Sequence, residues 1–104
     1  MQTSITPKEL AGLSGVTILD VRKRPAYDED DSVITGAIWR DPAMIGDWGG
    51  KLDQDRPVVC YCVHGHEVSQ DAAAALRGLG IDARYLEGGI RDWKDQGGDV
   101  ENKP

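Results

Sequence analysis

The chain has few cysteines, an excess of acidic over basic residues and no long apolar segment, and each of these features excludes a class of protein. Two cysteines in 104 residues are too few for a disulfide scaffold. Twelve basic residues against 18 acidic ones give a net charge of -6, and no cluster of Lys and Arg could follow a phosphate backbone. We therefore expect no nucleic-acid partner. No apolar run approaches a membrane span and no signal peptide is recognisable, so we expect no membrane partner and a cytoplasmic location.

Length and hydrophobic patterning predict one α/β domain that spans residues 1–104. Apolar, β-branched runs at 16–21 and 57–62 are typical of strands buried on both faces. The run 69–79 has the strongest helix pattern. Shorter patterns predict strands at 36–39 and 83–87, and helices at 6–14, 25–28, 41–48 and 90–96. Strands that alternate with helices indicate a mainly parallel central sheet flanked by helices on both faces, and residues 99–104 are expected to form a frayed tail.

Cys62 is the most informative residue of the chain. It stands where a strand pattern ends, and a short loop with a central glycine, Gly65, separates it from a helix pattern. Loop amides and the positive end of a helix dipole can stabilise a sulfur anion at such a place. The pattern therefore favours a nucleophile over the inert, buried role of most free cysteines. Cys60 lies inside the strand pattern, which favours a structural role.

A string of alternating ligand types raises the alternative of a metal site. Cys60, Cys62, His64 and His66 would all face one way on an extended strand and could bind zinc or copper. Gly65 and the helix pattern behind it favour a bend instead, and the spacing fits no structural-zinc motif, so we expect no metal. Either histidine could stabilise the thiolate or lie at the loop surface without a chemical role.

Four segments, in order, resemble the single-domain rhodanese-like sulfurtransferases over almost the whole chain. The family's loop commonly reads Cys-x-x-Gly-x-Arg followed by Ser or Ala, and Cys62 and Gly65 fit that spacing. The four matching segments are Leu19-Asp20-Val21-Arg22, Ile34-Thr35-Gly36-Ala37-Ile38, the loop from Cys62, and Leu86-Glu87-Gly88-Gly89-Ile90 with Trp93. The resemblance implies the rhodanese-like fold.

The resemblance also implies a sulfurtransferase that works through a persulfide on Cys62. That residue would take sulfur from a small donor such as thiosulfate or a persulfide and pass it to a thiol acceptor, small molecule or protein, with ping-pong kinetics. No cofactor is implied. The loop that would hold the persulfide through its amides consists of Val63, His64, Gly65, His66, Glu67 and Val68. Asp20 and Arg22 match a motif whose role is expected to be structural.

Glu67 departs from the family pattern, because it stands where the loop arginine is expected. Its charge should repel an anionic donor, so we expect weak use of thiosulfate. Arg40 could supply a compensating charge if it reaches the pocket, and Trp39 could form a wall of that pocket. Alternatively, Glu67 points to solvent or caps the following helix, where an acidic side chain is favourable.

Two other classes of function stay open. A non-enzymatic module of this fold, either a redox or persulfide sensor or a protein-docking domain, is compatible with an intact reactive cysteine. Arsenate reductase or phosphatase chemistry needs an arginine that grips a tetrahedral oxyanion, and no arginine lies between Cys62 and Arg77. The residues therefore favour sulfur transfer.

Overall fold

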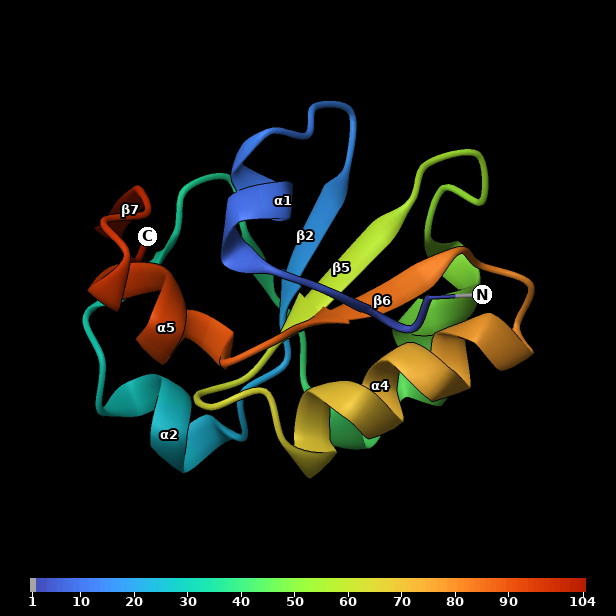
Figure 1. Cartoon of the computed structure of the whole chain (residues 1–104). Coiled ribbons are helices and arrows are strands. Elements are labelled where there is room, and N and C mark those ends of the chain that lie inside the picture. The colour runs from blue at the N-terminus through green and yellow to red at the C-terminus, as the bar shows by residue number, and fades with distance from the viewer. Residues whose placement is uncertain (1) are drawn as a thin grey trace.

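The computed structural model describes residues 2–104, with a five-stranded parallel sheet at its centre (Figure 1). The strands lie in the order β1-β6-β5-β2-β4, and every neighbouring pair is parallel. Their bounds are β1 Ser4–Ile5, β2 Thr17–Asp20, β4 Ile38–Trp39, β5 Val58–Tyr61 and β6 Ala83–Leu86. The predicted α/β class with a parallel central sheet is confirmed. Within residues 2–104, no helix is both long enough and apolar enough to pass through a bilayer.

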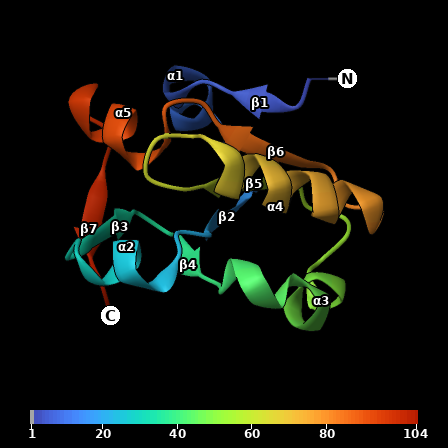
Figure 2. The ribbon, with the colours of Figure 1, turned by 90° about the horizontal axis from the view of Figure 1, so that it is seen from below.

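Helices cover both faces of this sheet, as the sequence predicts (Figure 2). On one face pack α1 (Pro7–Ala11) and α5 (Gly89–Asp95), and on the other α3 (Ile45–Trp48) and α4 (Glu67–Gly78). The chain begins α1 with a capping box, in which Thr6 and Glu9 satisfy each other's backbone amides. Short 3-10 turns at Pro42–Met44 and Gly49–Lys51 flank α3, and α2 (Arg24–Asp28) follows β2.

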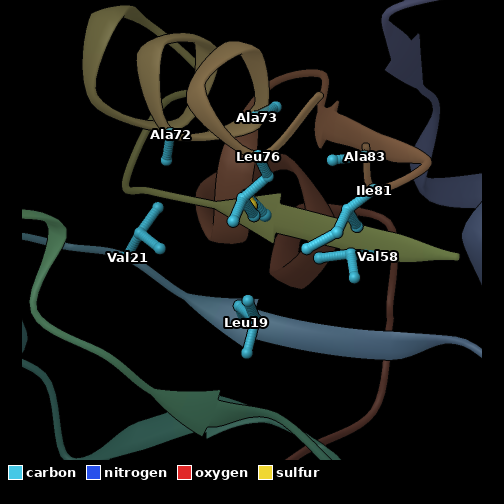
Figure 3. Close-up of a cluster of buried hydrophobic side chains, with 9 residues drawn as sticks. Leu19, Val21, Val58, Ala72, Ala73, Leu76, Ile81 and Ala83 are labelled. Carbon is cyan, nitrogen blue, oxygen red and sulfur yellow. The ribbon is translucent and has the colours of Figure 1, made fainter. Parts of the chain in front are cut away.

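The two cores arise from the alternation of side chains along β5. Val58 and Cys60 face α4, whereas Val59 and Tyr61 face α1 and α5. Figure 3 shows Ala72 and Leu76 of α4 pointing toward the sheet, and with Ala73 they belong to a core cluster that includes Val58 of β5 and Leu19 of β2. Full burial of a side chain such as Leu76 stabilises the fold by about 1.5–3 kcal/mol. The same packing fixes the start of α4, which lies directly behind the loop from Cys62.

Residues 99–104, for which the sequence predicts a frayed tail, contain a paired strand. The strand β7 (Val100–Asn102) runs antiparallel to β3 (Ser32–Ile34). Beyond it, the Lys103 amide donates to the Asp31 carbonyl at 2.8 Å, and the ammonium lies 4.2 Å from the centre of the Tyr27 ring. The expectation of fraying is wrong because β3 offers the tail an open edge, and β3 is too short to be read from hydrophobic pattern.

Candidate active site

Cys62 lies just beyond the carboxyl end of β5, in the middle of the parallel sheet. Parallel sheets present their ligand sites at that edge. Only 5% of Cys62 is exposed, and the residue lines a cavity of about 700 Å³. The cavity is lined by Arg22, Lys23, Ala26, Cys62, Val63, His64, His66, Glu67, Val68 and Gln70. Five of the six predicted loop residues therefore share a cavity with the predicted nucleophile.

Gly65 occupies a loop position that only glycine fits without strain. Its φ of +74° is in the left-handed region, and an added Cβ would lie 2.7 Å from both the Gly88 nitrogen and the Leu86 oxygen. The first residue of α5 also lies directly against the loop, because a Cβ on Gly89 would lie 2.4 Å from the Cys62 carbonyl oxygen. Two glycine positions therefore let the loop pack directly against the start of α5.

This packing separates the carbonyls of the loop from its amides. The Cys62 carbonyl accepts a hydrogen bond from the Ile90 amide at 3.0 Å, and the Val63 carbonyl accepts one from the Arg91 amide at 3.1 Å. Among the residues described by the structure, nothing accepts a hydrogen bond from the amides of residues 63–66. Glu67 begins α4, two residues before the predicted start, so the first amides of that helix lie next to this series. The loop therefore offers consecutive N–H donors to a bound anion.

The sulfur of Cys62 has a buried hydroxyl as its hydrogen-bond partner. The Cys62 thiol donates to Ser69 Oγ across 3.2 Å, and the Ser69 hydroxyl in turn donates to the His66 carbonyl across 3.4 Å. Ser69 lies in the first turn of α4 and is completely buried. Sequence reasoning missed this residue, because Ser69 meets the sulfur only through the path that the loop takes.

Asp20 and Arg22 form a buried ion pair behind the cavity. The Asp20 carboxylate accepts from Arg22 Nη2 at 2.6 Å and from Nε at 3.0 Å, and Asp30 accepts from Nη1 at 3.0 Å. Burial is the largest single influence and disfavours the charge of Arg22, but the hydrogen bonds to Asp20 and the nearby negative charges together outweigh it and raise the pKa of Arg22. Burial likewise opposes ionisation of Asp30, yet hydrogen bonds from Lys94 and Ser32 hold the pKa of Asp30 well below its usual range.

A model of the rhodanese-like domain matches residues 6–96 of the chain. The protein belongs to the rhodanese-like family. Thiosulfate sulfurtransferase GlpE of Coxiella burnetii is 34% identical over 87 residues, which cover 83% of this chain and 78% of that protein. The rhodanese-related protein of Thermoplasma volcanium superimposes with a TM-score of 0.84 at 27% identity, covering 96% and 98% of the two chains. A protein from Rhodopseudomonas palustris described as a possible tyrosine phosphatase gives 0.84 at 27% identity, covering 96% and 85%.

Two of the pocket residues expected in this rhodanese-like domain lie elsewhere. Trp39 stacks on Tyr27, with ring centres 5.1 Å apart, and its indole N–H donates to the Arg22 carbonyl at 2.8 Å. Arg40 is exposed and donates to the Trp39 carbonyl. Neither lines the cavity of Cys62, because both belong to the edge strand β4 and the turn after it. Among the cavity residues that the structure describes, the cation without an ion-pair partner is Lys23, which sequence reasoning passed over.

The two histidines of the rhodanese-like loop are exposed, and their ring centres are 5.9 Å apart. Both line the cavity. Across the described residues, no three or more His, Cys, Asp or Glu side chains gather as a metal site would require. The loop bends at Gly65, as the sequence predicts, and the Gln70 side chain fixes the bend by donating to the Gly65 carbonyl at 3.0 Å.

Cys60 has the environment of a core residue. It is completely buried, forms no disulfide and packs with Leu19 and Leu76 between β5 and α4. Burial raises the pKa of the Cys60 thiol to about 12, so it stays protonated at neutral pH. These contacts support the structural role that its place inside a strand predicts.

Proposed function

We propose that the protein is a sulfurtransferase that carries sulfur as a persulfide on Cys62. The observation that carries the proposal is the placement of Cys62 at a cavity whose loop has amides with no acceptor among residues 2–104. A persulfide extends the side chain by one sulfur and places a negative charge on that outer atom. The series of N–H groups from Val63 to Val68 is suited to hold it, as backbone amides hold anions at helix N-termini.

The reaction runs in two half-reactions. In the first, the Cys62 thiolate attacks the outer sulfur of the donor, the bond to that sulfur breaks, and the remainder of the donor leaves with the electron pair. In the second, a thiolate acceptor attacks the outer sulfur of the persulfide, and the Cys62 thiolate is released. Each step is a displacement at sulfur, so this reaction requires no cofactor. The two half-reactions predict ping-pong kinetics.

The charges of the cavity favour donors other than thiosulfate. Glu67 and Lys23 both line the cavity and both are exposed, and neither forms an ion pair within residues 2–104. The positive charge of Arg22 is already compensated by Asp20 and Asp30. Thiosulfate, a dianion, therefore meets the free cation of Lys23 and the free anion of Glu67, whose effects oppose each other. We expect persulfides to be the better donors. The acceptors are small or protein thiols.

Phosphatase or arsenate reductase chemistry fits this cavity less well. Such reactions need a guanidinium with two free N–H groups that face a tetrahedral oxyanion. The guanidinium that lines the cavity is that of Arg22, and its three nitrogens all donate to Asp20, Asp30 or the Ser32 carbonyl. A sensor or docking module is the remaining alternative, and only turnover separates it from an enzyme.

Mass spectrometry of the purified protein tests the proposal. After incubation with thiosulfate or with a small-molecule persulfide, we expect the peptide that contains Cys62 to gain the mass of one sulfur atom. Cyanide should remove that sulfur and appear as thiocyanate in repeated turnovers. Cys60→Ser provides the matched control and should still load sulfur, whereas Cys62→Ser should not. Loading without turnover would favour the sensor, and no loading from any donor would overturn the proposal.

A further inference from the structure

Within residues 2–104, the hydrogen bond to Ser69 is the one polar contact of the Cys62 sulfur, and the loop amides take no part in it. The thiol proton points to Ser69 Oγ at 3.2 Å, from a residue on the following helix. Ser69 is completely buried, so water does not replace this partner when the sulfur changes its charge. A hydroxyl differs from an amide because it can accept a hydrogen bond in one state and donate one in another.

We propose that Ser69 is a positioning residue that accepts the Cys62 S–H hydrogen bond at rest and donates a hydrogen bond to the Cys62 thiolate during sulfur transfer. The inference rests on the proposed function for its role in the reaction. When the thiol loses its proton to solvent, the hydroxyl hydrogen turns from the His66 carbonyl to the sulfur. The same 3.2 Å separation then holds a charge-assisted hydrogen bond.

The turn of the hydroxyl is inexpensive because the His66 carbonyl keeps a second partner. That carbonyl accepts the long hydrogen bond from Ser69 at 3.4 Å and another from the Gln70 amide at 3.2 Å. Only the longer of the two is given up when Ser69 turns to the sulfur. Neither state therefore leaves a buried polar atom without a partner, which is the condition for a switch inside a core.

Ser69 acts differently on the two half-reactions because it reaches the inner sulfur and not the outer one. In the persulfide, the negative charge lies on the outer sulfur, in front of the loop amides, and the inner sulfur is neutral. When an acceptor attacks the outer sulfur, the inner sulfur leaves as a thiolate beside Ser69 Oγ. A stabilised thiolate is a better leaving group and a weaker nucleophile. Ser69 thus favours discharge of the persulfide and moderates the attack that forms it.

Other titratable and charged groups around Cys62 stay the same when variants at Ser69 are compared. Those that share its cavity or its strand are Arg22 and Lys23 from the segment after β2, His64 and His66 from the loop, Glu67 from α4, and Cys60 from β5. A substitution at Ser69 changes none of them. A change in the pH profile of the Ser69→Ala variant therefore reports the hydroxyl.

Separate measurement of the two half-reactions in Ser69→Ala tests the proposal. Loading by a persulfide donor should be about 3- to 10-fold slower than in the parent at pH 7, since fewer molecules carry a thiolate. At about pH 10, above the ordinary pKa of a cysteine thiol, loading should be equal or faster. Discharge of the persulfide to cyanide should be about 3- to 10-fold slower at both pH values. Ser69→Thr, which keeps the hydroxyl, should restore the parent discharge rate.

The control for a mere packing defect is Ala73→Gly, which weakens the same helix at a buried position without a hydroxyl. It should leave the ratio of discharge to loading unchanged at about pH 10, where Ser69→Ala is expected to lower that ratio. A Ser69→Ala protein that is slower by the same factor in both half-reactions at both pH values would overturn the proposal, as would unchanged discharge. Alkylation of Cys62 by iodoacetamide across the same pH range needs no sulfur donor, so it tests Ser69 even if the protein transfers no sulfur.

Discussion

Cys60 and Cys62 are separated by one residue and have opposite environments. Cys60 lies inside β5, is completely buried against α4 and has its pKa raised to about 12. Cys62 lies just past the end of the strand, where the chain leaves the sheet, and it lines a cavity formed by the following loop and the segment after β2. The environment of each cysteine therefore depends on whether the strand has ended, and one residue separates a core thiol from the thiol that we propose as the nucleophile.

Selective alkylation of the two cysteines should give the largest difference. Iodoacetamide should modify Cys62 at least about a thousandfold faster than Cys60 in the folded protein, because Cys60 reacts only in the rare unfolded molecules. Peptide mass spectrometry resolves the two positions. In concentrated urea both should react at similar rates. Similar rates in the absence of urea would show that β5 and α4 do not seal Cys60.

Substitution of Gly65 should disturb the loop after Cys62 and slow the alkylation of that cysteine. Gly65→Ala adds a Cβ that meets backbone atoms at 2.7 Å, and we expect it to lower the free energy of unfolding by about 1–3 kcal/mol more than the control substitution. The control is Gly80→Ala, where φ is also positive, at +88°, but nothing lies within 4 Å. Urea unfolding gives the stabilities, and alkylation of Cys62 should slow only in Gly65→Ala. Equal losses in the two variants would mean that the contact with Gly88 is unimportant.

The contrast between the cysteines could be read from the sequence, because the strand, the glycine and the strong helix pattern lie within one short segment. The partner of Cys62 could not, since Ser69 meets the sulfur only through the path of the loop. The pocket positions predicted for Trp39 and Arg40 are wrong for a similar reason, because their placement depends on the path of β4, an edge strand of two residues. Strands as short as β1, β3 and β7 carry too little periodicity to be predicted.

The pH dependence of stability should report the burial of Cys60. Its pKa is raised from 9.0 in the unfolded chain to about 12 in the fold, so the folded protein retains a proton that the unfolded chain loses. The stabilisation is complete below pH 9 and declines as pH rises toward 12. Between pH 8 and about pH 10.5 the parent should lose about 2 kcal/mol that Cys60→Ala does not lose.

Urea unfolding of the parent and of Cys60→Ala at the two pH values measures this difference. Burial also raises the pKa of Tyr61, and that contribution is common to both proteins and cancels. Parallel pH profiles would contradict the description of Cys60 as sealed, because they would place the thiol in contact with water in the folded state.

The charge beside Cys62 should have the smallest effect of these changes. In Glu67→Arg, a cation replaces the free anion of the cavity, and we expect kcat/KM for thiosulfate to rise about tenfold at low salt and less at high salt. Turnover of an uncharged or weakly charged persulfide donor should change little. Asp82→Arg makes the same change of charge beside the amino end of β6, opposite the edge of the sheet that holds Cys62, and should leave thiosulfate use unaltered. If Glu67→Arg also leaves kcat/KM unaltered, the charge of Glu67 stabilises only the first turn of α4. It then does not contribute to the difference between the two cysteines.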